Sequence, residues 1–187
     1  SKQTEYRKLL VAPHGMRSGI SSRIKREIAH ANAGREAKIT LKLNSLVDPK
    51  MISQLYEASQ AGVKILLFVR GICCLRPGVK AMSENISVVS IVGRFLEHTR
   101  IYWFQNGGQP DVFIGSADLM RRNLDRRIEV LVPIENRALQ AVIKTKILDE
   151  YAKDNVHAWE LLANGSYRRL ASAEKEHFSV QEQLLTN

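Results

Sequence analysis

The feature that most constrains the fold is a short, almost uninterrupted apolar segment at residues 63–69, Val-Lys-Ile-Leu-Leu-Phe-Val. A segment of this length and character is typical of a β-strand with both faces buried. Residues 38–44 alternate polar and apolar at period two and predict another strand. Between them, Asp48 and Pro49 form an N-cap and a first-turn proline that predict a helix over 48–61. Strand, helix and strand joined in this way predict a βαβ unit with parallel strands.

The rest of the chain would extend this unit into a larger sheet. Apolar residues at helical spacing predict amphipathic helices over 18–33 and 135–152. Other short apolar segments predict strands at 9–13, 86–92, 100–104, 112–115 and 127–133. The turn residues Asn106-Gly107-Gly108 predict that two of these, 100–104 and 112–115, pair as an antiparallel hairpin. We therefore expect an α/β sandwich, with a mixed central sheet flanked by helices.

The domain organisation follows from the length of 187 residues. We expect a single domain over 1–187, with a core at about 9–153 and a more polar C-terminal extension at 154–187 that ends in a helix near 174–185. Because the first residue is Ser1 rather than Met, we expect the chain to be a fragment of a longer protein.

Composition narrows the partners and the compartment. Lys and Arg number 28 against 19 Asp and Glu, and the formal net charge of +9 favours anionic partners such as nucleotides, phosphates, nucleic acid or acidic lipid. No apolar segment approaches the roughly 20 residues of a transmembrane helix. The two cysteines, Cys73 and Cys74, are adjacent and cannot link distant segments, which predicts a reducing, cytoplasmic compartment. No cluster of His, Cys and carboxylate residues has the spacing of a metal site.

Arginines mark the first candidate site. Arg70 directly follows the buried segment 63–69, and ligands of open α/β sheets bind beyond the carboxyl ends of parallel strands. A guanidinium group can hold two phosphate oxygens at once, so Arg70 is a candidate phosphate ligand. Arg127 belongs to a cluster with Arg121, Arg122 and Arg126. The alternative for any one surface arginine is that it is solvated or paired with Asp118, Asp125 or Glu129.

His98 is the second candidate. It lies between two predicted strands, with Arg94 and Arg100 close in sequence. Imidazole is suited to proton transfer near neutral pH and can attack phosphorus as a nucleophile. The alternative is a structural histidine, which is the more common role of a single histidine.

Four segments resemble motifs of the polyphosphate kinase family: residues 69–78 (VRGICCLRPG), 90–102 (SIVGRFLEHTRIY), 115–118 (GSAD) and 122–130 (RNLDRRIEV). The resemblance extends over about 10–167. It implies a phospholipase D-like domain, the last of the enzyme and one of two such halves that face each other across the active site.

The resemblance also implies an activity. In that family the γ-phosphate of ATP passes reversibly to a histidine of the preceding half, and then to inorganic polyphosphate, with Mg²⁺ accompanying the nucleotide mainly outside this domain. This chain would lack the phosphorylated histidine and be inactive alone. Arg70, His98 and Arg127 would contact ATP or polyphosphate, and His98 would be the catalytic residue, either as an acid or base or as a phosphate ligand. The implied partners are ATP or ADP, polyphosphate and the preceding half, and the longer enzyme could associate with itself or with a membrane surface.

Departures from the phospholipase D pattern leave two other interpretations open. Arg100 stands in place of a lysine, Gln105 in place of an aspartate, and Asp118 ends a motif that usually ends in asparagine. These changes argue against His98 as a covalent nucleophile. One alternative is a basic nucleic-acid-binding module, although aromatic residues are only 6% of the chain and nucleic acid is not an expected partner of the kinase. The other is a stand-alone phosphodiesterase that acts as a homodimer.

Overall fold

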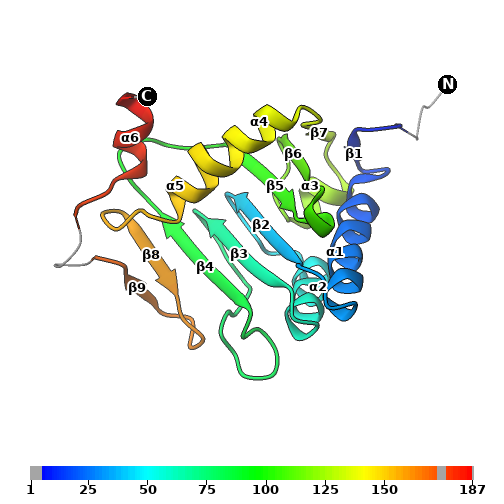
Figure 1. The fold of residues 1–187 in the computed structure, drawn as a ribbon, viewed down its shortest axis with the longest axis horizontal. Helices are drawn as coiled ribbons and strands as arrows, with labels where there is room; N and C mark the ends of the chain where they lie inside the picture. Colours follow the sequence, from blue (N-terminus) through cyan, green and yellow to red (C-terminus); the bar gives the residue numbers. More distant parts are fainter. Residues whose placement is uncertain (1–5, 172–175, 187) are drawn as a thin grey trace.

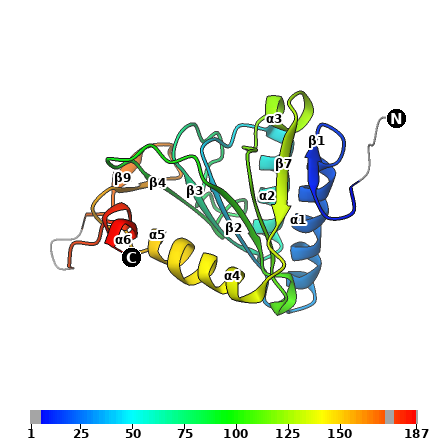
Figure 2. The same ribbon diagram turned by 90° about the horizontal axis from the view of Figure 1, so that it is seen from above.

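Residues 6–171 and 176–186 are described by a computed structural model, and within them one nine-stranded sheet carries helices on both faces (Figures 1 and 2). The strand order is β1-β7-β6-β5-β2-β3-β4-β8-β9. In chain order the strands are β1 (Leu10–Ala12), β2 (Lys38–Leu43), β3 (Lys64–Val69), β4 (Ile86–Ile91), β5 (Arg100–Phe104), β6 (Asp111–Gly115), β7 (Glu129–Pro133), β8 (Ala158–Leu161) and β9 (Tyr167–Arg169).

The helices cover the two faces of this sheet. They are α1 (Met16–Asn32), α2 (Pro49–Gln60), α3 (Arg121–Asp125), α4 (Arg137–Val142), α5 (Asp149–Tyr151) and α6 (Val180–Thr186). A π-helical stretch, η2 (Ile143–Leu148), joins α4 to α5, so the helix predicted at 135–152 is confirmed as a nearly continuous element. Figure 2 shows α4 and α5 on one side of the sheet and α1 and α2 on the other.

The predicted βαβ unit is confirmed, and it forms the centre of the sheet. β2 and β3 run parallel in register, with Leu43 opposite Val69, and β3 also pairs parallel with β4. β5 pairs antiparallel with β2 and forms the predicted hairpin with β6 through a short 3₁₀ turn at Asn106–Gly108. The sheet is therefore mixed, as expected. The fold class predicted from the sequence is correct.

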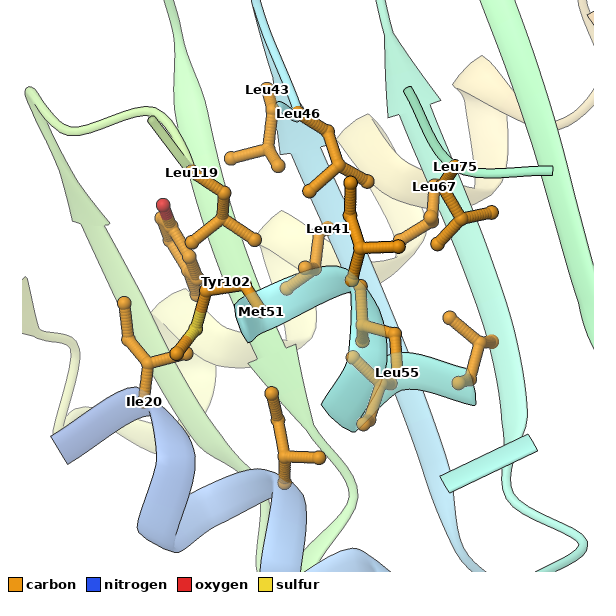
Figure 3. Packing of buried hydrophobic residues seen from close by; sticks show 14 of the residues in the cluster. Ile20, Leu41, Leu43, Leu46, Met51, Leu55, Leu67, Leu75, Tyr102 and Leu119 are labelled. Atoms are coloured by element: carbon orange, nitrogen blue, oxygen red, sulfur yellow. The ribbon is translucent and has the colours of Figure 1, made fainter. Parts of the chain in front are cut away.

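Alternation along the strands divides the core into two clusters. On one face, Leu41, Leu67 and Tyr102 pack against Ile20 of α1 and Met51 of α2, as Figure 3 shows from close by. On the other face, a second cluster joins the sheet to the helices α4 to α6; its members include Phe68, Ile101, Trp103, Ile143, Leu148, Tyr151 and Val180. Adjacent residues such as Leu67 and Phe68 thus belong to opposite clusters, which is why residues 63–69 are apolar almost throughout.

The C-terminal stretch differs most from expectation. β8 and β9 extend the sheet beyond β4, although the sequence indicated no strands there. All three residues of β9 are exposed and every one is polar or amphipathic, so no period-two apolar pattern marks it. The final helix begins at Val180 rather than near 174, and residues 176–179 are not helical. Residues 174 and 175 of the predicted helix lie outside the described residues.

Two smaller differences concern helices. α1 begins at Met16, two residues earlier than predicted, and α3 was not expected because five residues are too few to show a helical pattern. Across the described ranges, none of the helices combines the length and apolar character needed to cross a bilayer.

Candidate functional site

The sequence candidates meet along one edge of the sheet because of the strand directions. β2, β3 and β4 run parallel and end at this edge, while the antiparallel strands β5 and β7 begin there. Arg70 follows β3, His98 and Arg100 stand at the start of β5, and Arg127 precedes β7 by two residues. We call this the carboxyl edge. Topology thus gathers four residues that are far apart in the sequence.

Loops at the carboxyl edge are tied together by backbone hydrogen bonds. Leu46, after β2, forms bridges with Cys73 on one side and Leu119 on the other. The amide of Gly71 donates to the carbonyl of Asn44 over 2.8 Å, and a Cβ at residue 71 would come within 2.9 Å of that carbonyl oxygen. These bonds fix the backbone that carries Arg70, since the loop cannot move without breaking them.

Arg70 is partly buried and is held by an amide rather than a carboxylate. Its Nε donates to Oδ1 of Asn44 over 3.0 Å. Among the described residues no acidic side chain forms an ion pair with it. A guanidinium has five N–H donors, so this bond leaves about four of them, all on the two Nη atoms, without a protein partner in the described ranges. The charge on Arg70 is therefore available to an anion.

A small cavity of about 20 Å³ lies beside Arg70, and its walls include Lys42, Asn44, Glu97 and Tyr151. The Nζ of Lys42 donates to Oε2 of Glu97 over 3.0 Å and lies 4.6 Å from the centre of the Tyr151 ring. Burial lowers the pKa of Lys42, an effect that the Glu97 carboxylate opposes. Lys42 and Glu97 thus neutralise each other, and the remaining positive charge around the cavity is that of Arg70.

Two buried groups around this cavity have no hydrogen-bond partner within the described residues: Nδ2 of Asn44 and the hydroxyl of Tyr151. Both side chains are strongly buried, at 8% and 4% exposure. Unsatisfied donors of this kind are uncommon in folded proteins, and they are typical of places where water or a ligand supplies the missing acceptor. They lie next to Arg70, so the arrangement favours an oxygen-rich ligand there.

Arg100 stands at the same edge but is neutralised. Its Nη2 lies 3.0 Å from Oδ2 of Asp118, and its Nε donates to Oδ1 of the same carboxylate. Asp118 is buried, and it also accepts the amides of Asn44 over 2.7 Å and of Ser45 over 3.2 Å. Two departures from the phospholipase D pattern therefore pair with each other. The carboxylate that replaces an asparagine neutralises the arginine that replaces a lysine.

Ser116 and Gln105, at two other positions of the phospholipase D pattern, also form hydrogen bonds to carboxylates. The Ser116 hydroxyl donates to the buried carboxylate of Glu129, which holds the start of β7. Gln105 follows the end of β5 and donates to Glu36, so it lies at the opposite edge of the sheet from His98. The acidic residue next to His98 in the sequence is Glu97, and its carboxylate pairs with Lys42.

His98 is exposed, in the segment that joins β4 to β5. Its carbonyl accepts a 2.7 Å hydrogen bond from Nη1 of Arg100, which fixes the backbone at this point. Within the described ranges its ring has no hydrogen-bond partner. Its neighbour Glu97 lines the cavity beside Arg70. The structure thus brings Arg70 and Glu97, the residue before His98, to one cavity.

Arg127 lies farther along the edge. Four strand steps of about 4.8 Å separate β7 from β3, so its backbone is on the order of 19 Å from that of Arg70. Arg121, Arg122, Arg126 and Arg127 are all exposed, and none of them has an ion pair with a described residue. Asp125, in their midst, pairs instead with Arg17 of α1 over 2.7 Å. The cluster is a positive surface, separate from the cavity.

A dedicated metal site does not fit the residues of this edge. The described part of the chain contains no group of three or more His, Cys, Asp or Glu side chains placed to hold a metal ion. The carboxylates nearest the cavity, Glu97 and Asp118, are already paired with cationic side chains. Cys73 and Cys74 are free thiols, and burial raises the pKa of Cys73 to about 11, so its thiol stays protonated at neutral pH.

Sequence reasoning missed Lys42, Asn44 and Asp118 as parts of the site. A signal was present for Lys42 and Asn44, because they belong to the polar set of the alternating segment 38–44. Such residues point to the same face and need partners when that face is buried. The sequence marks Asp118 as a motif residue and as a possible partner of surface arginines, but its pairing with Arg100 depends on the β5–β6 hairpin register.

Comparison with known proteins assigns a family. The model for "Polyphosphate kinase C-terminal domain 2" matches residues 9–181. The polyphosphate kinase of Prochlorococcus marinus strain MIT 9313 is 53% identical over 186 residues, which are 99% of this chain and 26% of that protein. The polyphosphate kinase of Pseudomonas aeruginosa is 52% identical over 170 residues, which are 91% of this chain and 24% of that protein. The chain thus spans about a quarter of the length of the curated relatives it matches.

Solved structures agree with this assignment. The crystal structure of polyphosphate kinase from Porphyromonas gingivalis matches with a TM-score of 0.94 and 38% identity, over 100% of this chain and 28% of that one. A phospholipase D family member, Nuc from Salmonella typhimurium, matches with a TM-score of 0.50 and 13% identity over 73% of this chain and 88% of that one. The second likeness concerns the fold alone.

Proposed function

The chain belongs to the polyphosphate kinase family, and we propose that it is the phosphate-binding C-terminal domain of an enzyme that transfers the γ-phosphate of ATP to inorganic polyphosphate. One observation carries the proposal. Arg70 is the partly buried guanidinium of the carboxyl edge that has no carboxylate partner among the described residues, whereas Lys42 and Arg100 beside it are neutralised.

Phosphoryl transfer depends mainly on positioning and on neutralising the charge of phosphate oxygens. Asn44 fixes Nε of Arg70 and leaves the two Nη atoms for phosphate oxygens. A guanidinium held in advance costs little reorganisation when charge develops in the transition state. In our proposal, Arg70 binds the phosphates of ATP or polyphosphate at the cavity, and the unpartnered Asn44 Nδ2 and Tyr151 hydroxyl add donors beside it.

His98 has an accompanying role in this proposal. The phosphoryl group leaves ATP and bonds to a histidine nitrogen of the preceding half, and it then passes from that nitrogen to a terminal oxygen of polyphosphate. His98, exposed in the segment whose Glu97 lines the cavity, donates or accepts a proton at the phosphate oxygens during these steps. It is not the phosphorylated residue. Arg127, in the exposed cluster, contacts the polyphosphate chain farther out.

The remaining parts of the proposal concern the setting. Mg²⁺ reaches the site bound to the nucleotide, because this edge offers no ligand set of its own within the described residues, and we assign no step to it. The partners are ATP or ADP, polyphosphate and a preceding phospholipase D-like half. The free thiols of Cys73 and Cys74 support a cytoplasmic location. Self-association and contact with a membrane surface stay predictions.

The test is Arg70→Ala in the longer enzyme that carries this domain. Removing one preorganised charged donor is expected to lower kcat/KM for polyphosphate synthesis by about 10²–10³-fold. The measurement is a steady-state assay of ATP consumption with polyphosphate as acceptor. Normal turnover by the Arg70→Ala enzyme would contradict the proposal.

Arg35→Ala is the matched control. Arg35 is exposed and lies between α1 and β2, at the opposite edge of the sheet, and its replacement makes the same change in net charge. We expect its kcat/KM to stay within about twofold of the wild-type value, because long-range effects of an exposed charge are screened by salt. An equal loss in both variants would show that total charge, and not the cavity, matters.

A further inference from the structure

The segment that carries His98, residues 93–99, has no helix or strand of its own. It leaves Phe95 and Leu96 40% and 70% exposed, so apolar burial contributes little to holding it in place. An imidazole on such a segment is only as well positioned as the side chains that hold the backbone around it. Those side chains come from distant parts of the chain.

Gln181, in the first turn of α6, makes three hydrogen bonds to this segment. Its Oε1 accepts the amide of Phe95 over 2.9 Å, and its Nε2 donates to the carbonyl of Phe95 over 2.9 Å. Nε2 also donates to Oε1 of Glu97 over 2.7 Å. Gln181 is itself buried, at 6% exposure. The three bonds engage both the backbone two residues before Glu97 and the side chain next to His98.

Other contacts extend this arrangement on both sides of His98. The second carboxylate oxygen of Glu97 accepts from Lys42 of β2 over 3.0 Å, and Arg100 holds the carbonyl of His98. Gly93 lies so close to Gln181 that a Cβ there would come within 2.4 Å of Oε1. The segment is thus fixed to α6, β2 and β5, and α6 supplies the part that is remote in sequence.

α6 is in turn anchored to the rest of the fold. Oδ2 of the buried Asp154 accepts the amide of Val180 over 2.9 Å, while its Oδ1 accepts the amide of His157 ahead of β8. Val180 is fully buried in the cluster that also contains Phe68 and Tyr151. Figure 1 shows α6 beyond the end of β4, near the point where the His98 segment begins. These contacts hold α6 in place, and Gln181 is held in place with it.

We propose that Gln181 is a positioning residue for His98, and that the C-terminal helix α6 belongs to the active site by holding residues 93–99 next to the cavity beside Arg70. The catalytic consequence of this role rests on the proposed function. Only a side chain that both donates and accepts can satisfy the amide and the carbonyl of Phe95 together. A side chain of equal volume without those groups fills the space and leaves the segment unheld.

The test uses Gln181→Met in the longer enzyme, with Gln181→Ala as the second variant if methionine disturbs folding. Glu182→Ala is the matched control, because Glu182 is the next residue of α6 and is exposed. Amide hydrogen exchange of residues 93–99 measures how firmly the segment is held, independently of activity. We expect faster exchange there in Gln181→Met, at the Phe95 amide above all, and unchanged exchange in Glu182→Ala.

Activity is then measured in a double-mutant cycle with His98→Ala. We expect Gln181→Met alone to lower kcat/KM on the order of tenfold, since small misplacements of a reacting group are costly. In the His98→Ala background the same change should matter less than about twofold, because a residue that acts through His98 has nothing left to position. A helix that serves stability alone would give the same fold loss in both backgrounds.

Three results would overturn the proposal: unchanged exchange at 93–99, equal losses in the two backgrounds, or full activity of Gln181→Met. If His98→Ala is itself fully active, His98 has no role in the reaction and the positioning role falls with it, although Arg70 and the family assignment stand. If Arg70→Ala is also fully active, it is the proposed function that has failed. The exchange result then shows whether Gln181 still holds the segment.

Discussion

Arg70 and Arg100 stand at the same edge of one sheet, separated by two strand steps of about 4.8 Å each, and differ in what holds them. Arg70 is held by the neutral amide of Asn44 and keeps its charge. Arg100 shares two hydrogen bonds with the buried carboxylate of Asp118. Arg70 is therefore available to bind an anion, whereas Arg100 stabilises the fold.

The comparison teaches that the partner of an arginine, and not its position or its neighbours in sequence, decides its role. Arg17 of α1 is a third example at this edge, since Asp48 and Asp125 both pair with it over 2.8 Å and 2.7 Å. A basic composition thus says little about which guanidinium meets the ligand. Substitutions at these residues would separate the roles of the neutralised and the free arginines.

The largest effect is expected for Asp118→Ala. This change leaves Arg100 without its carboxylate and leaves the amides of Asn44 and Ser45 without an acceptor. Breaking a buried ion pair from one side costs about 3–5 kcal/mol, so we expect the free energy of unfolding of the chain to fall by about that amount. Urea denaturation measures it.

Asp118→Asn is the control for this prediction, because it places there the residue of the phospholipase D pattern. An asparagine oxygen can still accept the amide of Asn44, so only the negative charge that neutralises Arg100 is lost. We expect a smaller loss of stability than for alanine. Equal stability of the wild-type chain and Asp118→Ala would mean that the pair does not hold the edge.

Exchanging arginine for lysine sharpens the contrast at the level of activity. Arg70→Lys keeps the charge but loses the planar fork that holds two phosphate oxygens, and we expect kcat/KM of the longer enzyme to fall by about tenfold. Arg100→Lys keeps an ion pair with Asp118 but loses the bond to the His98 carbonyl, so we expect a smaller fall in kcat/KM, by about two- to threefold. Steady-state kinetics of both variants would refute the contrast if Arg100→Lys proved the more damaging.

The pH dependence of stability tests the ion pairs of Arg17 with Asp48 and Asp125. A hydrogen bond from the Arg17 guanidinium lowers the pKa of Asp125, and Arg17 likewise holds the pKa of Asp48 below its usual value against the effect of burial. A carboxyl whose pKa is lowered by folding contributes stability above its unfolded pKa and loses it as pH falls through its folded pKa. We therefore expect these contributions to be present at neutral pH and to be lost progressively below about pH 4.

Asp125→Asn checks this sign directly. Because Asp125 is exposed, its pair with Arg17 is expected to contribute no more than about 0.5 kcal/mol at neutral pH. The difference in unfolding free energy between wild type and Asp125→Asn should shrink as pH falls from the unfolded pKa of Asp125 through its folded pKa. Urea denaturation at pH 7 and pH 3 measures it. A difference that grows in acid would contradict the assignment.

The smallest effect is expected for Arg127→Ala. Arg127 is exposed, far from the cavity, and one of four arginines in its cluster. We expect KM for long polyphosphate to rise by about two- to threefold and KM for ATP to stay unchanged, because a single exposed charge is largely screened. A large change in KM for ATP would place Arg127 in the cavity and weaken the contrast with Arg70.

The centre of the fold was predictable because local patterns and long-range structure agree there. The apolar segment 63–69 and the alternation at 38–44 each indicate one element, and together they require the parallel pair at the middle of the sheet. The hairpin between β5 and β6 followed from its turn residues. β8 and β9 were missed because these two strands at the end of the sheet carry no apolar alternation, and the pairing of β8 with β4 and of β9 with β8 is decided by tertiary contacts.

The candidate site was predictable in part for a related reason. Arg70 and His98 could be named, since a charge after a buried strand and a histidine between arginines are visible in the sequence. Their partners could not. Asn44 reaches Arg70 because β2 and β3 are parallel and in register, and Gln181 reaches Phe95 from a helix that is 86 residues away. Pairings of this kind depend on the whole fold.

The most direct test of the account is a crystal structure of the longer enzyme with a non-hydrolysable ATP analogue or a short polyphosphate. We predict phosphate oxygens within hydrogen-bond distance of the Nη atoms of Arg70, with the pair between Arg100 and Asp118 intact. A phosphate bound to Arg100 with Asp118 displaced, while Arg70 contacts no phosphate, would contradict it.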